Sequence, residues 1–199
     1  MSEPLPVQLR GSRLARGLLR LAGWRVVFPG FPSLQGVLVL YPHTSNWDLV
    51  VGILAKWAAG IPLSFWSKKA LFDWPVFGRW LRWVGGMPVD RESSRGRVQD
   101  MLEHFRSAQA EDRFLWLGIA PEGTRRHVPA WRSGFYNLAF AAGVPVGLGY
   151  IDYGRRVIGV EHFMTLSGDR AADMAEIAAH LGHCHGLRRG CEAPIRFEP

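Results

Sequence analysis

Cysteine is scarce in this sequence. Its 199 residues include two cysteines, Cys184 and Cys191, and both lie near the C-terminus. Two cysteines do not make the framework of a disulfide-rich secreted domain, so a reducing compartment is expected. The N-terminal stretch has no compact apolar region followed by a small-residue cleavage site, so a secretory signal is not expected.

Long apolar runs are also missing. The nearest is the stretch 49–66, which is interrupted by Lys56, Gly60 and Pro62. Because a membrane-spanning helix needs about 20 mostly apolar residues, this stretch is better explained as a helix, a turn and a strand of a buried core. Internal repeats are absent too, and no serine stands in a nucleophile-elbow pattern.

Acidic residues are outnumbered. The sequence has 24 lysines and arginines against 17 acidic residues, which gives a formal net charge of +7. This balance suggests an anionic partner, such as nucleic acid, an acidic membrane surface or a phosphorylated small molecule. With 48% hydrophobic residues, the chain is long and apolar enough for one globular domain with a sizeable core.

Strand patterns alternate with helix patterns along the chain. Strands are expected at residues 36–40, 63–66, 87–90, 114–119, 144–153 and 156–161, and helices at 9–24, 46–59, 72–84, 93–110, 133–142 and 171–181. The alternation predicts a single-domain α/β fold with a mostly parallel central sheet flanked by helices, and the last two strands are expected to form a hairpin. His43, Arg91 and residues 122–125 each follow a strand directly, where such sheets carry functional loops.

A histidine lies where a buried strand gives way to a helix. His43 follows the apolar run 37–41, and Asp48 comes five residues later. The two cannot share one helix face, but they meet if Asp48 reaches back from the first turn to a loop histidine. A carboxylate on one ring nitrogen leaves the other as a general base. Alternatively, Ser45-x-x-Asp48 is a capping box that only closes the helix end.

A second polar segment reads Pro-Glu-Gly-Thr-Arg at residues 121–125. Arg125 offers a planar fork to phosphate oxygens, and the backbone N–H groups of Gly123 and Thr124 can add to it. The alternative interpretation is a tight turn with solvated charges.

His43-x4-Asp48 followed downstream by Pro-Glu-Gly-Thr-Arg resembles the glycerolipid acyltransferase family, which includes the 1-acylglycerol-3-phosphate acyltransferases. Residues 68–78 resemble the segment between its first two motifs, residues 86–91 its second motif, and residues 143–146 its fourth. The resemblance covers about residues 36–150 and implies a glycerol-phosphate acyltransferase-like fold. The sequence departs from the family at Ala120, where a bulky apolar residue is usual, and at residues 147–149, where the fourth motif usually has a second proline.

The resemblance implies an O-acyltransferase. A fatty acyl group would pass from acyl-CoA or acyl carrier protein to the free hydroxyl of a lysophospholipid such as 1-acyl-glycerol-3-phosphate, in phospholipid biosynthesis or remodelling. His43 is expected to be the base and Asp48 its orienting partner, with backbone N–H groups near Gly123 or Asn46 available for the oxyanion. The residues implied in acceptor binding are Lys68, Lys69, Arg91, Glu122, Gly123, Thr124 and Arg125. Neither a cofactor nor a metal is expected.

The N-terminal segment is amphipathic. Leu14, Leu18, Leu21 and Trp24 can share one stripe of a helix flanked by arginines, which suits an anionic lipid interface. Peripheral association with the cytoplasmic side of a membrane is therefore expected, and an ordinary helix packed on the domain is the equal alternative. The predicted division is an N-terminal segment 1–30, an acyltransferase domain 31–182 and a C-terminal tail 183–199.

Other functions remain open. A thioesterase or lipid hydrolase would use the same histidine and aspartate with water as the nucleophile. A non-catalytic binder of anionic ligands such as nucleic acid would explain the charge, but Trp57, Trp66 and other tryptophans fall in apolar runs, so a nucleic-acid partner is not expected. A metal-binding module would use the C-terminal donors, although a solvated tail is the simpler interpretation. Those donors are His180, His183, Cys184, His185 and Cys191.

Overall fold

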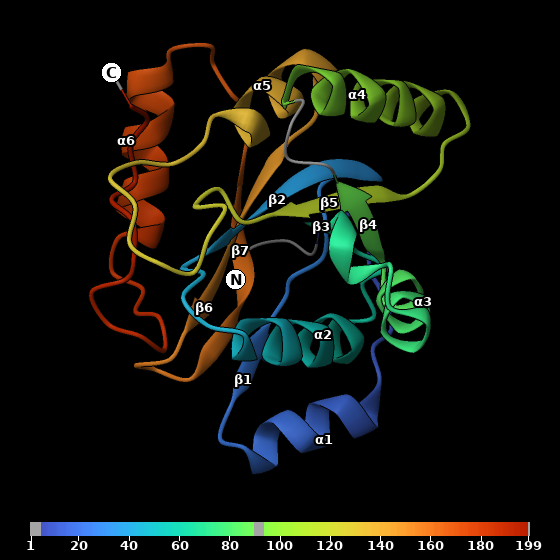
Figure 1. Ribbon diagram of the computed structural model, residues 1–199, viewed down its shortest axis with the longest axis vertical. Coiled ribbons are helices and arrows are strands. Elements are labelled where there is room, and N and C mark those ends of the chain that lie inside the picture. The colour runs from blue at the N-terminus through green and yellow to red at the C-terminus, as the bar shows by residue number, and fades with distance from the viewer. Residues whose placement is uncertain (1–4, 90–93, 199) are drawn as a thin grey trace.

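A seven-stranded sheet forms the centre of the protein, with helices on both faces (Figure 1). The computed structural model describes residues 5–89 and 94–198, so Arg91 of the second motif lies outside the described residues. The strands are β1 (Arg25–Val27), β2 (Gln35–Tyr41), β3 (Ser64–Lys68), β4 (Gly86–Val89), β5 (Leu115–Ile119), β6 (Val146–Asp152) and β7 (Val157–Met164). The helices are α1 (Arg13–Leu21), α2 (Trp47–Ala59), the short 3-10 helix η1 (Lys69–Leu71), α3 (Pro75–Trp83), α4 (Ser94–Ala110), α5 (Gly134–Ala142) and α6 (Arg170–Leu181).

The strand order is β1-β7-β6-β2-β5-β3-β4. The block from β6 to β4 is parallel throughout, whereas β7 runs antiparallel to β6 and β1 runs parallel to β7. The predictions of a mostly parallel sheet and of a hairpin between the last two strands of the chain are both confirmed. Since β2 lies between β5 and β6, the loops that follow β2 and β5 leave the same edge of the sheet side by side.

The N-terminal region differs from its prediction in two ways. Helix α1 is shorter than residues 9–24, because Ser12 caps it by accepting a hydrogen bond from the Ala15 N–H and the chain turns at Gly23 with φ +76°. The strand β1, which the sequence did not predict, follows at once and pairs with β7. Among the described residues, no helix combines the length and apolarity that crossing a membrane requires.

The face of the sheet toward α4, α5 and α6 is filled. Alternate residues of the central strands, including Val37, Val39, Leu117 and Leu148, join one apolar cluster with these helices. Leu138 of α5 and Ile177 of α6 are completely buried there. This face is an ordinary close-packed core.

The opposite face lies toward α2 and α1 and combines glycines with large side chains such as Trp116. The intervening residues are Leu38 and Leu40 on β2, Gly118 on β5, and Gly147 and Gly149 on β6. A side chain at Gly118 would press on Leu63 and Leu40 at 3.1 and 3.3 Å from its Cβ, and Leu40 would lie 3.2 Å from a Cβ at Gly149. Gly147 and Gly149 lie in the stretch where the fourth motif usually has a second proline. Because they have no side chains, they leave room for Leu38 and Leu40 beneath α2.

Candidate active site

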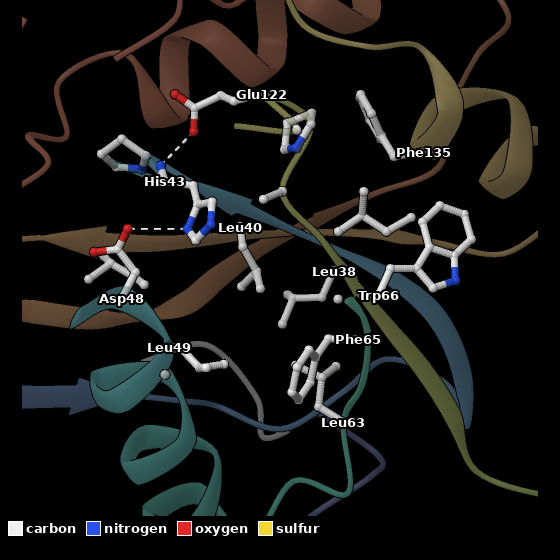
Figure 2. A pocket seen from close by; sticks show the side chains of 18 of the residues that line it. Leu38, Leu40, His43, Asp48, Leu49, Leu63, Phe65, Trp66, Glu122 and Phe135 are labelled. Atoms are coloured by element: carbon white, nitrogen blue, oxygen red, sulfur yellow. Dashed lines mark hydrogen bonds and ion pairs between the residues drawn. The ribbon is translucent and has the colours of Figure 1, made fainter. Parts of the chain in front are cut away.

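His43 and Asp48 meet at the end of the central strand β2. His43 lies in the loop after β2, and Asp48 lies in the first turn of α2. The His43 Nδ1 atom is 3.2 Å from Asp48 Oδ2, as the dashed line in Figure 2 shows. A quarter of the His43 side chain is exposed, whereas the Asp48 side chain is almost completely buried. With Nδ1 directed at the carboxylate, Nε2 is the nitrogen left to act as a base.

Asp48 also closes the helix end. Its Oδ2 atom accepts hydrogen bonds from the backbone N–H groups of Thr44 and Ser45, both at 2.8 Å, and the Ser45 hydroxyl accepts one from the Trp47 N–H. The capping-box interpretation holds in part, because Asp48 reaches back to the Ser45 N–H while Asn46 is the N-cap of the helix. The same carboxylate contacts the histidine. The cap fixes the loop that carries His43, which is how a local sequence signal produces a rigid site.

Glu122 supports the same loop from below the surface. Its carboxylate accepts hydrogen bonds from the His43 N–H at 2.5 Å and from the Ala193 N–H at 3.1 Å. Burial raises the pKa of Glu122, and the two N–H donors act in the opposite direction. Glu122 is only 1% exposed and holds the backbone of the loop, and it lines the same cavity as the other residues of its motif.

The C-terminal stretch is not a solvated tail. Tyr41 donates a hydrogen bond to the Ala193 carbonyl, the Arg188 N–H donates to the Thr44 hydroxyl, and Ala193 is completely buried. The contact of Gly186 with Thr44 is so close that a Cβ there would lie 2.4 Å from the hydroxyl. The residues after α6 thus pack against the His43 loop, and periodicity could not predict this because the stretch has no regular structure.

The C-terminal metal module is not formed either. His183 lies 2.8 Å from an Arg155 nitrogen, Cys184 is buried, and His180 stacks on His162. In the part of the chain that the structure describes, these C-terminal donors do not gather with one another, and of the five His180 alone belongs to a group that could hold an ion, with His162 and Glu176.

A cavity of about 1430 Å³ opens beside His43 and Asp48. One part of it runs between α2 and the sheet, where Leu38, Leu40, Leu49, Ile53, Leu63 and Phe65 line it. Figure 2 shows Leu40 and Leu49 nearest to the histidine and aspartate, with Leu38, Leu63 and Phe65 beyond them. The apolar part can take a hydrocarbon chain whose reactive end lies at His43.

The polar part of the cavity carries the cationic motif residues. Lys68 at the end of β3 and Thr124 and Arg125 after β5 line it, together with Gly123. Lys69 belongs to the exposed helix η1 and does not line the cavity. The Gly123 N–H donates to the Ala120 carbonyl at 3.1 Å, so this amide closes a turn.

Two residues of the site escaped sequence reasoning. Tyr153, which directly follows β6, donates a hydrogen bond to Asp48 Oδ1, with 2.9 Å between the two oxygens. Trp131 lines the cavity, and its indole N–H is the one buried side-chain donor or acceptor without a hydrogen-bond partner among residues 5–89 and 94–198. Neither lies in a motif, and only the fold brings them to the site.

Comparisons with known proteins point to acyltransferases. A family model described as Acyltransferase matches residues 26–147. The chain is 30% identical over 130 residues to lysophosphatidylcholine acyltransferase 2 from Danio rerio, an alignment that covers 62% of this chain and 23% of that protein. The chain therefore matches less than a quarter of the length of this curated relative.

The fold also matches a solved structure, the 1-acyl-sn-glycerophosphate (LPA) acyltransferase PlsC from Thermotoga maritima. The match has a TM-score of 0.54 and 17% sequence identity, and it covers 84% of this chain and 73% of that one. At this identity the likeness concerns the fold. The family match spans both β2 with its His43 loop and the Pro-Glu-Gly-Thr-Arg turn after β5, and the chain belongs to the glycerolipid acyltransferase family.

Proposed function

We propose that this chain transfers a fatty acyl group from a thioester donor, acyl-CoA or acyl carrier protein, to the free hydroxyl of a lysophospholipid such as 1-acyl-glycerol-3-phosphate. The observation that carries the proposal is the His43–Asp48 pair at the mouth of a cavity with an apolar arm and a cationic part. Fatty acyl groups and phosphate-bearing acceptors need these two environments side by side.

His43 would take the proton of the acceptor hydroxyl on Nε2 as the oxygen attacks the thioester carbonyl. Asp48 holds the Nδ1–H and stabilises the imidazolium. The new C–O bond forms, the C–S bond breaks, and the proton passes from His43 to the thiolate that leaves. Lys68 and Arg125 would hold the acceptor phosphate, and Leu38, Leu40 and Ile53 the acyl chain.

The experiment is thiol release from a panel of acyl-CoAs, with and without lysophosphatidic acid. We expect acceptor-dependent release that falls by about 10²–10⁴-fold in His43→Ala, because that is the usual cost of losing a general base. His104→Ala, which changes an exposed histidine of α4, is the matched control and should keep full activity. Release without acceptor would indicate a thioesterase, and near-normal turnover of His43→Ala would exclude the mechanism. If acyl-CoAs give no release, acylated carrier protein is the next donor in the same assay.

A membrane surface is the second part of the proposal. Apart from Phe140 and Leu187, the large apolar side chains exposed among the described residues belong to α1, α2 or residues 71–83. They include Leu14, Leu18 and Leu21 on α1, Trp74 just before α3 and Trp83 at the end of α3. We call these exposed residues of α1, α2 and 71–83 the apolar helix surface.

The apolar helix surface is accompanied by positive charge. Arg13, Arg16 and Arg20 on α1 and Arg79 and Arg82 on α3 are exposed. Helices that combine exposed leucine and tryptophan with arginine bind anionic lipid interfaces. Helix α1 itself packs on α2 through Ala15 and Leu19, so the ordinary-helix interpretation also holds, and its leucine stripe remains outward. Peripheral binding of the cytoplasmic leaflet would give the active site access to both substrates.

A further inference from the structure

The carboxylate of Asp48 is held on both of its oxygens. Oδ2 serves His43 and the backbone of the loop, whereas Oδ1 accepts a hydrogen bond from the Tyr153 hydroxyl at 2.9 Å. Tyr153 follows β6, at the turn of the hairpin between β6 and β7, and is about a hundred residues from Asp48 in the chain. A contact between such distant residues depends on the whole sheet being assembled.

The hydroxyl of Tyr153 can act on the reaction only through Asp48. A carboxylate held by one oxygen can rotate about its Cβ–Cγ bond, whereas donors on both oxygens fix its plane and therefore the direction of the hydrogen bond to His43. Burial and then the charge of Asp48 raise the pKa of Tyr153, so the hydroxyl keeps its proton and stays a donor at neutral pH.

Trp24 fixes the ring of Tyr153 in turn. The two ring centroids are 4.9 Å apart and the planes stand at 87°, an edge-to-face contact. Trp24 is buried and lies just after α1, the helix that carries the exposed leucines. One line of contacts thus runs from the end of α1 to the carboxylate of the active site.

We propose that Tyr153 is a positioning residue for acyl transfer, which aligns Asp48 and through it His43, and that Trp24 supports it. The inference rests on the proposed function. Its rival is a purely structural role, in which the hydroxyl only satisfies a buried carboxylate.

The protein contains a matched control for this test. The Tyr136 hydroxyl donates to Asp173 Oδ2 at 2.6 Å, so there is a second tyrosine–aspartate pair whose own residues do not line the cavity. In Tyr153→Phe we expect kcat to fall about tenfold at unchanged KM, the factor that corresponds to one hydrogen bond to a charged group. Tyr136→Phe should leave kcat unchanged, although it also removes a buried hydroxyl. Equal kcat in Tyr153→Phe and the parent would overturn the inference.

Trp24→Leu is also expected to lower kcat, but by a smaller factor than Tyr153→Phe. Combined with Tyr153→Phe, it should add nothing, because both act through one hydroxyl. Additive losses would overturn the role of Trp24.

A second measurement tests the inference without relying on turnover. In ¹⁵N spectra of the imidazoles, with His43→Ala to assign the signal, Tyr153→Phe should shift the His43 ring nitrogens and Tyr136→Phe should not. If the parent lacks activity, the proposed function fails, while this shift still decides whether Tyr153 acts on His43.

A separate observation concerns the outer side of α6. Glu176 and His180 lie one turn apart on this helix, and His162 faces them from β7. His162 Nε2 is 2.9 Å from a Glu176 oxygen, and the rings of His162 and His180 stack with centroids 3.7 Å apart. Their possible ligand atoms all lie within 4.8 Å of one another.

Two imidazoles and one carboxylate are a common zinc ligand set, with water in the fourth position. The three residues come from two elements whose packing is fixed by Met174, Ile177 and Leu181 in the core, so the donors are already gathered. We propose that His162, Glu176 and His180 bind a divalent transition metal of the Zn²⁺ type, apart from the acyl-transfer site. Such an ion would tie α6 to β7.

Titration of the tag-free, metal-stripped protein with Zn²⁺ by calorimetry tests this site. We expect one equivalent per chain and a higher Tm with Zn²⁺, both lost in His162→Ala and Glu176→Gln and both kept in His104→Ala. Binding that survives His162→Ala, or an absence of binding in the parent, would overturn the proposal.

Discussion

On the α4–α6 side of the sheet, the central strands present Val37, Val39 and Leu117 to a filled core, whereas on the α2 side the same strands present Leu38, Leu40 and Gly118 to a cavity. Side chains alternate along a strand, and the set of positions that faces α2 includes several glycines, which leave space on that side. One sheet thereby supplies rigidity on one face and substrate space on the other.

The two tyrosine–aspartate pairs show the same division. Asp173 of the Tyr136–Asp173 pair also accepts a hydrogen bond from the Ser167 hydroxyl on the filled side, whereas Asp48 of the Tyr153–Asp48 pair contacts a histidine that reaches the cavity. The same hydrogen bond, from a tyrosine hydroxyl to an aspartate, therefore stabilises packing at Asp173 and, in our proposal, supports catalysis at Asp48.

The largest expected effect on stability comes from the filled face. Leu138→Ala removes a completely buried side chain of α5 and should lower the free energy of unfolding by about 2–5 kcal/mol. Leu49→Ala is the matched change on the cavity side, where the side chain is only partly buried, and should cost about 1 kcal/mol or less. Urea unfolding measures both, and equal losses would break the comparison of the two faces.

The next effect concerns the apolar helix surface. Replacing Leu14, Leu18 and Leu21 together by serine should weaken partitioning to anionic vesicles by about 100-fold, since each leucine contributes roughly 1 kcal/mol when it enters the interface. Stability should change little, because the three side chains are 47–88% exposed. Leu187→Ser, an exposed leucine elsewhere, is the control. Unchanged sedimentation of the triple variant with vesicles would reject α1 as the docking helix.

A pH-dependent effect is expected at Asp173. Burial alone would raise its pKa, but hydrogen bonds from Tyr136 and Ser167 outweigh burial and bring the pKa below the usual 3.8. The contribution to stability is therefore complete above the unfolded value and is lost as the pH falls through the folded value. Asp173→Asn should cost about 1–3 kcal/mol at neutral pH. The difference in the free energy of unfolding between the parent and Asp173→Asn should become smaller in acid. Urea unfolding of both proteins at pH 7, and at the lowest pH where the parent stays folded, measures this difference. A difference that does not change with pH would contradict this account.

The smallest effect is a gain. Gly52 lies inside α2 against the cavity, and a Cβ there would meet nothing within 4 Å. Gly52→Ala should stabilise the protein by about 0.5–1 kcal/mol through helix propensity.

Gly52→Leu should fill part of the cavity and shift thiol release toward shorter acyl-CoAs. Gly17 of α1 is equally open but does not line the cavity, so Gly17→Ala and Gly17→Leu should leave the chain preference unchanged.

Much of this molecule follows from local sequence signals. Alternation of strands and helices predicted the sheet, and the spacing of His43 and Asp48 predicted that a loop histidine and a first-turn carboxylate meet. Both depend on residues within a few positions of each other, where backbone geometry leaves few choices. The two motifs converge because parallel strands β2 and β5 are neighbours.

The tertiary structure decided the rest. Glu122 joins the His43 loop to Ala193, which its motif did not predict, and Tyr153 reaches Asp48 from the end of β6. Leu14 and Leu18 stay exposed while Trp24, expected in the same stripe, is buried. No local pattern contains these facts, because each depends on which distant segment covers a side chain, and that is fixed only when the sheet and its helices pack together.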